Sequence, residues 1–438
     1  MNELLKFNKI MFVQFKFNNY RSFKGETTLS MVAAPTIQHE DNSIMHVDTD
    51  LDLLKIVAVY GANASGKTKL FQAYRFMGKM VCDLATNNKS NWQEEYVPYL
   101  LDKDSYKATS SFEASFLMDG IIYRYGYTID AHKVVEEWLY RQKGEKNTEI
   151  FYRDVTGTHY NKTYVRPEVI EPLKKQKMLR DDTLLLAVLA IWNHVLARKV
   201  VSCFFNTNVL SSTAGTGMTG FSIKSLASPM KNNIIRFMKS ADINIEDMSL
   251  REMDVESLPE EVKMYISKDN KRANKYIDGV NTLHKVYDEN GISDAFVRFS
   301  LENDESYGTY RLFALSAPII DTLRYGRILF VDEIDNGLHP DILKAIVTLF
   351  NTSEINHNNA QLIINTHNID LLDDMHLFKQ DQVYVTEKDR FGEARLEPML
   401  KYALNSEVSL GQLYREGRLG GVPYLARFMN NVLIGMNE

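Results

Sequence analysis

The sequence predicts a mixed α/β fold, in which apolar strands deliver polar residues to one edge of a sheet. Three observations support this fold class. The apolar strand Ile56 to Tyr60 runs directly into Gly61-Ala62-Asn63-Ala64-Ser65-Gly66-Lys67-Thr68. A second apolar strand, Arg327 to Val331, ends in Asp332 and Glu333, and a third, Gln361 to Asn365, ends in Thr366 and His367. Continuous apolar runs of this length are typical of strands covered on both faces, and ligands of open α/β sheets bind at the carboxyl ends of the strands.

The composition limits the classes of function. The 438 residues are enough for two or three domains. A hydrophobic fraction of 45% and a charged fraction of 25% are ordinary for a soluble globular protein. With a net charge of −6, any contact with nucleic acid must be a local patch. Cys82 and Cys203 cannot form a multi-cysteine zinc site and indicate a reducing compartment, so we expect a cytoplasmic protein.

No membrane association is expected from the sequence. The N-terminal residues contain no apolar segment followed by a small-residue cleavage site, so a signal peptide is not predicted. The best apolar run, Leu184 to Ile191, is far shorter than the ~20 residues that a bilayer-spanning helix needs. A buried helix is the better interpretation of this run.

Three parts follow one another along the chain. Residues 1–165 contain strands around Phe12, Phe15 and Phe17, the glycine-containing loop, and a hairpin of Ser111 to Met118 and Ile121 to Ile129 joined by Asp119-Gly120. Residues 166–248 are predicted to be a helical insert. Residues 249–438 contain strands at Val262 to Ser267 and Thr282 to Tyr287, then alternating helices and strands. No internal repeat or sustained heptad pattern occurs, so the middle part is predicted to be a compact insert without a coiled-coil arm.

The loop from Gly61 to Thr68 matches the phosphate-loop pattern G-x-x-x-x-G-K-[S/T], known as Walker A. Its glycines allow the backbone to wrap a phosphate with N–H groups pointing inward. Lys67 can then reach the β- and γ-phosphates, and the Thr68 hydroxyl can ligate Mg²⁺. A glycine-rich turn is the alternative, but the preceding strand and the following helix favour a site for ATP and Mg²⁺.

The acidic pair after the second strand matches Walker B. Asp332 is placed to hold Mg²⁺ through water, and Glu333 to polarise the attacking water. In isolation the pair would equally fit a strand that ends in an acidic turn, but the phosphate loop in the same chain favours a catalytic site. Asp332 follows Lys67 by 265 positions, which predicts inserted material between the two halves of one sheet.

Two further features depend on their position. Ser306-Tyr307-Gly308-Thr309 opens an apolar helix, and Ser306 is predicted to cap that helix and leave N–H groups for an anion. His367 ends a buried strand, where a histidine is often only a polar cap. Because it follows the acidic pair closely, we interpret it as a sensor of the γ-phosphate.

This order of motifs resembles the ABC-type ATPase heads of the SMC, RecF and OLD group. The resemblance implies an ABC-type P-loop ATPase head with a mixed sheet, an antiparallel β lobe, and a helical insert between Walker A and the signature. Two heads would sandwich two ATP molecules, with Lys67, Glu333 and His367 catalytic and Asp335 in a dimer-contact loop. Ser306 and Gly308 would form the signature and act on the partner's nucleotide. Asn19-Tyr20-Arg21-Ser22-Phe23 resembles the group's N-F-R-S-F element, so Arg21 and Ser22 are expected to border the nucleotide.

The resemblance is closer to the RloA- or AbiL-like AAA-family ATPases of bacterial phage-defence and abortive-infection loci. The segments that carry it are Ser306 to Thr309, Asp332 to Pro340, Asn365 to Asn368, the strand Asp381 to Asp389, and Tyr414 to Pro423. It implies a homodimeric switch that binds and hydrolyses ATP and controls a separate toxin or nuclease. The group's glutamine loop has only a weak candidate, Gln93.

Two alternatives stay open. A RecF-like DNA-repair ATPase would bind DNA through basic stretches such as Lys174, Lys175, Lys177 and Arg180, or Lys268, Lys271, Arg272 and Lys275, although both stretches equally fit a solvated surface. A scaffold that binds ATP without turnover is disfavoured by Glu333. A neighbouring toxin gene would favour the defence interpretation, and ATP-dependent binding to gapped DNA would favour repair.

Overall fold

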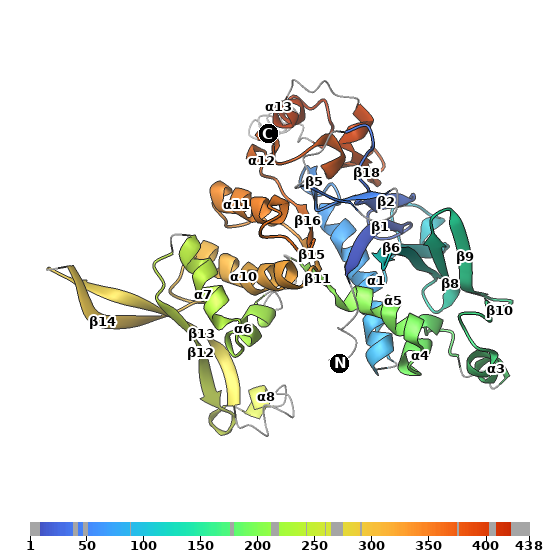
Figure 1. Cartoon of the computed structure of the whole chain (residues 1–438), viewed down its shortest axis with the longest axis horizontal. Coiled ribbons are helices and arrows are strands. Elements are labelled where there is room, and N and C mark those ends of the chain that lie inside the picture. The colour runs from blue at the N-terminus through green and yellow to red at the C-terminus, as the bar shows by residue number, and fades with distance from the viewer. Residues whose placement is uncertain are drawn as a thin grey trace, which may run out of the picture. The chain divides into compact units, whose positions relative to one another are not determined.

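The computed structural model describes residues 9–37, 43–46, 51–87, 89–175, 179–211, 219–241, 243–258, 260–263, 275–289, 291–374, 376–402 and 409–421 (Figure 1). The chain forms two compact units. Unit 1 comprises 1–211, 323–334 and 344–438, and unit 2 comprises 212–322 and 335–343. The division into 1–165, 166–248 and 249–438, which follows motifs along the sequence, stays a prediction about functional parts.

A six-stranded, largely parallel sheet in unit 1 carries the three predicted strands at its centre. Its order is β11 (Thr207–Leu210), β15 (Ile328–Val331), β16 (Gln361–Asn365), β5 (Ile56–Gly61), β17 (Val383–Lys388) and β18 (Ala394–Pro398). Only β18 runs antiparallel to its neighbour. All residues of β5, β15 and β16 are buried, as their continuous apolar runs require. The predicted α/β class is therefore confirmed.

The antiparallel β lobe is a seven-stranded sheet in the same unit. Its order is β10 (Gly157–Tyr160), β9 (Lys146–Asp154), β8 (Val134–Lys143), β7 (Ile121–Ile129), β6 (Ser110–Met118), β1 (Ile10–Phe17) and β2 (Thr27–Ser30). The predicted hairpin is confirmed, because Asp119 and Gly120 form the turn between β6 and β7 with φ of 51° and 69°. A separate ribbon pairs β3 (Ile44–His46) with β4 (Asp52–Leu54).

Aromatic side chains join the two large sheets through α1 (Lys67–Asn87), the helix that follows the phosphate loop. The rings of Tyr74 on α1 and Phe330 on β15 stack with centroids 4.3 Å apart. Phe12 on β1 meets both rings edge-on, at 5.5 and 5.7 Å. Pairs of this kind contribute about 0.5–1.5 kcal/mol each beyond their buried area. The start of α1 is thereby fixed relative to both sheets.

The remaining helices of unit 1 are short. They are α2 (Trp92–Glu95), α3 (Pro167–Lys175), α4 (Leu185–Ile191), α5 (Val195–Phe205), α11 (Pro340–Asn351, whose first residues belong to unit 2), α12 (Asp370–Asp373) and α13 (Leu410–Arg415), with 3₁₀ turns at Ser105–Lys107, Gln380–Gln382 and Met399–Tyr402. The predicted buried helix is α4, which packs on α1 together with α5. No single helix in the described residues is long and apolar enough to cross a bilayer; α4 and α5 pass that test only as a pair bent by 108°.

A buried ion pair connects the β lobe to α4. The Glu137 carboxylate accepts backbone hydrogen bonds from Leu185 at 2.6 Å and Leu186 at 2.8 Å, and lies 3.5 Å from Arg153. Burial raises the pKa of Glu137, while Arg153 and the two N–H groups act in the opposite direction. The first turn of α4 is thus capped by a carboxylate from β8.

Unit 2 contains a three-stranded antiparallel sheet and helices. The sheet order is β12 (Asp247–Asp254), β13 (Lys275–Asp288) and β14 (Gly291–Ser300). The helices are α6 (Gly220–Leu226), α7 (Lys231–Ser240), α8 (Glu260–Lys263) and most of α10 (Tyr307–Tyr325), with a 3₁₀ turn at Val255–Ser257.

Two predictions for the middle of the chain need correction. The strand predicted from Val262 is wrong at its start, because Val262 and Lys263 belong to α8, while residues 264–267 lie outside the described part. The strand predicted at Thr282 to Tyr287 is confirmed within β13. The segment predicted as mostly helical is interrupted by β11, which pairs with β15 in unit 1.

Candidate nucleotide site

The phosphate loop connects β5 to α1 and has the backbone that its glycines permit. Gly61 and Gly66 have φ of 152° and 122°, and Ala64 has a left-handed φ of 61°. A Cβ on Gly66 would come within 2.9 Å of the Ala394 Cβ and 3.2 Å of the Phe23 ring. Phe23, from the Asn19 to Phe23 element, therefore packs directly against the loop and leaves no room for a side chain there.

Lys67 lies over the loop that precedes it. Its Nζ donates to the carbonyl oxygens of Gly61 at 2.8 Å and Ala62 at 3.0 Å, and the residue is only 6% exposed. Gly61 and Ala62 thus hold the lysine through their carbonyl groups and do not themselves line the cavity in front of the loop. The ammonium group is held where a phosphate oxygen can replace these acceptors.

The rear of the loop is supported by β17 and by the C-terminal segment. The Ser65 hydroxyl is hydrogen-bonded to the Thr386 hydroxyl, which also donates to the Tyr60 carbonyl at 3.2 Å. The rings of Tyr60 and Tyr414 lie 5.7 Å apart, and the Tyr414 hydroxyl donates to the Gly421 carbonyl at 3.0 Å. A Cβ on Gly421 would come within 3.2 Å of the Gly61 Cα, so this segment lies directly behind the loop.

The acidic pair is organised by Asn365 at the end of the neighbouring strand β16. Asp332 is fully buried, and its Oδ1 accepts from the Thr68 hydroxyl at 3.1 Å and from the Asn365 amide. The Asn365 Oδ1 in turn accepts from the Glu333 backbone N–H at 2.6 Å. Glu333 has a left-handed φ of 50°, a conformation that costs a non-glycine residue roughly 1–3 kcal/mol and is common at functional sites.

A cavity of about 320 Å³ opens in front of the loop. It is lined by Ser22, the loop and first α1 residues Asn63, Ala64, Ser65, Gly66, Lys67, Thr68 and Lys69, and by Glu333, His367 and Lys388. Burial lowers the pKa of Lys69, and the nearby charges of Arg21 and Lys388 lower it further. Three lysines at one cavity, Lys67, Lys69 and Lys388, favour a polyanion such as a nucleoside triphosphate.

The site residues expected from the sequence divide into those at this cavity and those elsewhere. Ser22, Glu333 and His367 line it, whereas Asp332 lies behind Thr68. Arg21 points to other partners, since its Nε donates to the Tyr20 hydroxyl at 3.1 Å. Gln93 lies in α2 and does not line the cavity.

Sequence reasoning missed Lys388, Thr386 and the bridging role of Asn365. Their position in the chain could have identified them, because all three stand at or near the carboxyl ends of strands adjacent to β5 or β15.

The signature residues belong to unit 2, as does Asp335. The Ser306 Oγ accepts from the Thr309 N–H at 3.1 Å, so the predicted cap of α10 is present. A Cβ on Gly308 would clash with the Gly337 carbonyl at 2.6 Å, so glycine is required where the loop after Asp335 approaches the helix. The Oε1 atom of Glu305, the residue before Ser306, lies 2.7 Å from the Nε2 atom of His284 on β13.

The residues present fit a magnesium ion that arrives with a nucleotide. Among the described residues, no cluster of three or more histidine, cysteine or acidic side chains could hold a metal. Mg²⁺ is usually bound by one or two carboxylates together with substrate phosphates and water, not by a complete protein cage. The adjacent oxygens of Thr68 and Asp332 supply this partial set of ligands.

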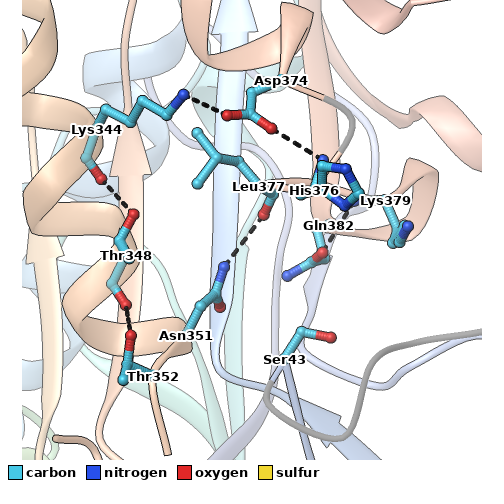
Figure 2. Close-up of a pocket in the computed structure, with 10 residues that line it drawn as sticks. All are labelled: Ser43, Lys344, Thr348, Asn351, Thr352, Asp374, His376, Leu377, Lys379 and Gln382. Atoms are coloured by element: carbon cyan, nitrogen blue, oxygen red, sulfur yellow. Dashed lines mark hydrogen bonds and ion pairs between the residues drawn. The ribbon is translucent and has the colours of Figure 1, made fainter.

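A second cavity, of about 270 Å³, is lined by polar residues of α11 and of the segment before β17 (Figure 2). Its groups are largely paired with one another: Lys344 with Asp374, the Asp374 carboxylate with the His376 N–H, and the Asn351 amide with the Leu377 carbonyl at 3.2 Å (Figure 2). Lys344 lowers the pKa of Asp374. These contacts attach the segment between α12 and β17 to α11, and we assign them a structural role.

The parallel sheet, the phosphate loop after β5 and the acidic pair after β15, which is separated from β5 by β16, define a P-loop ATPase of the mixed α/β class. Residues 56–374 match the family described as "AAA domain, putative AbiEii toxin, Type IV TA system". Since the match covers well over half of the chain, the protein belongs to this family.

Among solved structures, the SMC head domain from Thermotoga maritima aligns with 88% of this chain and 98% of its own length, at 12% identity and a TM-score of 0.37. A similarity this weak supports no argument, so the fold is assigned from the chain's own sheets and loop. A search of curated proteins finds no significant match.

Proposed function

We propose that this protein is an ATP-hydrolysing switch that dimerises on ATP and controls a separate effector in bacterial defence against phage. The observation that carries the ATPase proposal is the cavity in which Lys67, Glu333 and His367 face the same space in front of the phosphate loop. These side chains come from three adjacent strand ends of one sheet, where ligands of α/β proteins bind.

The proposed chemistry uses few residues. The loop N–H groups and Lys67 bind the β- and γ-phosphates, and Lys388 adds positive charge at the mouth of the site. Bound Mg²⁺, held by Thr68 and Asp332, would neutralise charge on the phosphates. Glu333, fixed by the hydrogen bond of its backbone to Asn365, orients and deprotonates the attacking water. His367 contacts the γ-phosphate and registers its loss.

The proposal of a dimer rests on the resemblance to ABC-type heads and on the form of the signature. Ser306 caps α10 with its hydroxyl, and the following residue, Tyr307, is 56% exposed, so the start of the helix is accessible. A helix start of this kind offers N–H groups and the positive end of the helix dipole to an anion. In the proposed dimer that anion is the γ-phosphate bound by the partner.

The family description mentions a type IV toxin–antitoxin system, which supports a defence role. The alternative is a RecF-like repair ATPase, and four of the basic residues on which it depends, Lys177, Lys268, Lys271 and Arg272, lie outside the described residues. Arg180 is paired with Asp182 at 2.9 Å and Lys275 with Glu252 at 2.7 Å. ATP-dependent binding of the purified protein to gapped DNA, absent for intact duplex, would favour the repair alternative.

The test of the composite site mixes two defective proteins. Lys67→Ala removes the phosphate contact of the loop, and Ser306→Arg fills the signature position, so each protein alone should be inactive as an ATPase. A heterodimer pairs the intact loop of one chain with the intact signature of the other and restores one of two sites. We therefore expect partial recovery of phosphate release on mixing, after subunit exchange has been verified with labelled chains.

Asn303→Arg is the matched control, because it adds the same bulk and charge at an exposed position three residues earlier in unit 2. Asn303→Arg alone should keep full ATPase activity. Mixing it with a second chain should therefore give no further increase in phosphate release. An inactive mixture despite demonstrated exchange, or hydrolysis by a strict monomer of the wild type, would contradict the head-to-head dimer while leaving the ATPase proposal intact.

A further inference from the structure

The largest of the described cavities lies away from the phosphate loop, between the β lobe and the α4–α5 turn of unit 1. Its volume is about 690 Å³, within the roughly 300–1,000 Å³ typical of small-molecule sites. Five segments line it: β7, β8, the segment before and at the start of α3, the α4–α5 turn, and α5. The lining includes the cations Arg141, Arg166 and Lys199 and the rings of Tyr123, Tyr164 and Trp192.

The lining is cationic in a chain whose net charge is −6. Arg141, Arg166 and Lys199 face the cavity, and no acidic residue is among the lining side chains. Lys199 is paired with Asp119 outside the lining, but the Arg166 guanidinium makes no ion pair within the described residues. Three cations around one cavity, with no acidic residue in its lining, indicate an anionic ligand.

Arg141 shows that the site has unused hydrogen-bonding capacity. Its guanidinium lies over the Tyr164 ring, 5.2 Å from the centroid, and one terminal nitrogen donates to the Tyr164 hydroxyl. Its Nε is buried and has no hydrogen-bond partner. A buried donor without a partner is unfavourable, so a ligand oxygen that reached the Arg141 Nε would be bound favourably.

Aromatic rings accompany these cations. The Tyr123 ring lies beneath the Lys199 ammonium at 5.8 Å, and the Trp192 side chain is 43% exposed. His194 holds the α4–α5 turn in place: its Nδ1 accepts from the Ala197 N–H at 3.2 Å, so its Nε2 donates to the Tyr164 carbonyl at 2.9 Å. The Trp192 ring is therefore carried on a fixed turn and is available for stacking.

We propose that this cavity binds a nucleotide, with a phosphate group on Arg141, Arg166 and Lys199 and a base on the Trp192 ring. Arginine with exposed aromatic rings is the combination that proteins use for unpaired nucleotides. The ligand is either a free mononucleotide or the end of a single strand, since both present the same phosphate and base. The site is separate from the phosphate loop, and the inference does not depend on the proposed defence function.

Binding can be measured on the full chain in a Lys67→Ala background with EDTA, which suppresses the first nucleotide site. The probes are 2-aminopurine ribonucleoside 5′-monophosphate and a short single-stranded oligonucleotide with 2-aminopurine at its 5′ end. Stacking of the base should quench its fluorescence saturably. Trp192→Ala and Arg166→Glu should each weaken binding about tenfold or more, the scale of one stacking or charge contact.

Lys162→Glu is the matched control for Arg166→Glu, because it reverses a charge at an exposed position four residues away that does not line the cavity. It should leave binding unchanged. Quenching of the mononucleotide identifies a free nucleotide as the ligand, and quenching of the oligonucleotide alone identifies a strand end; both support the proposal.

Three results with the nucleotide probes would overturn the proposal. They are no saturable binding of either probe, equal binding by Arg166→Glu and the wild type, and competition by inorganic phosphate as strong as by the mononucleotide. Binding only to anionic phospholipid vesicles would likewise overturn it, since the exposed Trp192 and Val195 would then be membrane contacts.

Discussion

Replacing Asn365 with alanine separates the geometry of the acidic pair from nucleotide binding. Asn365 is fully buried, donates to the Asp332 carboxylate and accepts from the Glu333 N–H at 2.6 Å. The substitution removes both bonds, at a cost of roughly 1–3 kcal/mol for each group left unsatisfied. Asp332 keeps its bond from Thr68. Glu333 loses the contact that holds its left-handed backbone, which itself costs about 1–3 kcal/mol to maintain.

We expect the backbone at Glu333 to relax and its carboxylate to leave the water-binding position. Turnover should fall about 10²–10⁴-fold, the usual contribution of a positioned general base. ATP affinity should change by less than about tenfold, because Lys67 and the loop are untouched. Phosphate release and calorimetry on the same preparation measure the two quantities. In a Glu333→Gln background, Asn365→Ala should reduce turnover little further, since the two changes act through one group.

Asn356→Ala is the matched control for this experiment. Asn356 is equally buried, and its side chain makes three hydrogen bonds to the backbone at 2.6, 2.8 and 2.9 Å in the loop before β16. Its loss should lower thermal stability at least as much as Asn365→Ala, yet leave turnover per folded molecule intact. Wild-type turnover in Asn365→Ala, or an equal loss of turnover in Asn356→Ala, would refute the reasoning.

Four further predictions concern single side chains. Lys67→Ala should weaken ATP binding strongly in calorimetry, and an unchanged affinity would reject the phosphate-loop assignment. Glu333→Gln should bind ATP but release phosphate about 10²–10⁴-fold more slowly; unchanged release would show that another group activates water. His367→Ala should impair turnover more than ATP binding, whereas equal weakening of ATP and ADP with intact turnover would make it a structural cap. Arg153→Met leaves the Glu137 carboxylate buried without its partner, so the free energy of chemical unfolding should fall by roughly 3–5 kcal/mol. Lys401→Met, which breaks an exposed ion pair, is the control and should lower that free energy by less than about 1 kcal/mol.

Local signals in the sequence were sufficient for the central strands. Gln361 to Asn365 is predicted with its correct bounds, because five consecutive residues are buried on both faces and the polar segment after them ends the strand. The hairpin at Asp119-Gly120 follows from the left-handed backbone of that turn. β11 was missed because its four residues are only partly buried and its partner β15 lies more than 100 positions later. No local pattern contains that pairing.

The site residues likewise fall into two groups: those that the sequence predicts and those that only the structure identifies. Residues within a contiguous motif, such as Lys67 and Thr68, are recognisable without a structure. Lys388 and the bridging amide of Asn365 depend on the order β15-β16-β5-β17, which determines which strand ends meet. The Arg21 side chain donates a hydrogen bond to the Tyr20 hydroxyl, and the sequence motif does not determine this orientation. The second proposed nucleotide site, the cavity between the β lobe and the α4–α5 turn, is lined by five segments, and no spacing in the sequence connects them.

The strand that leads into the phosphate loop has consequences for biosynthesis. β5 is wholly buried, but its neighbours β16 and β17 and the Gly421 segment behind the loop are more than 290 residues downstream. At roughly 5–20 residues per second, the ribosome needs on the order of 15–60 s to supply them. Throughout that time the nascent chain carries an apolar strand without its sheet partners, a state that favours aggregation. A chain terminated early in translation lacks β16 and β17 and therefore cannot assemble the phosphate loop beside its neighbouring strands.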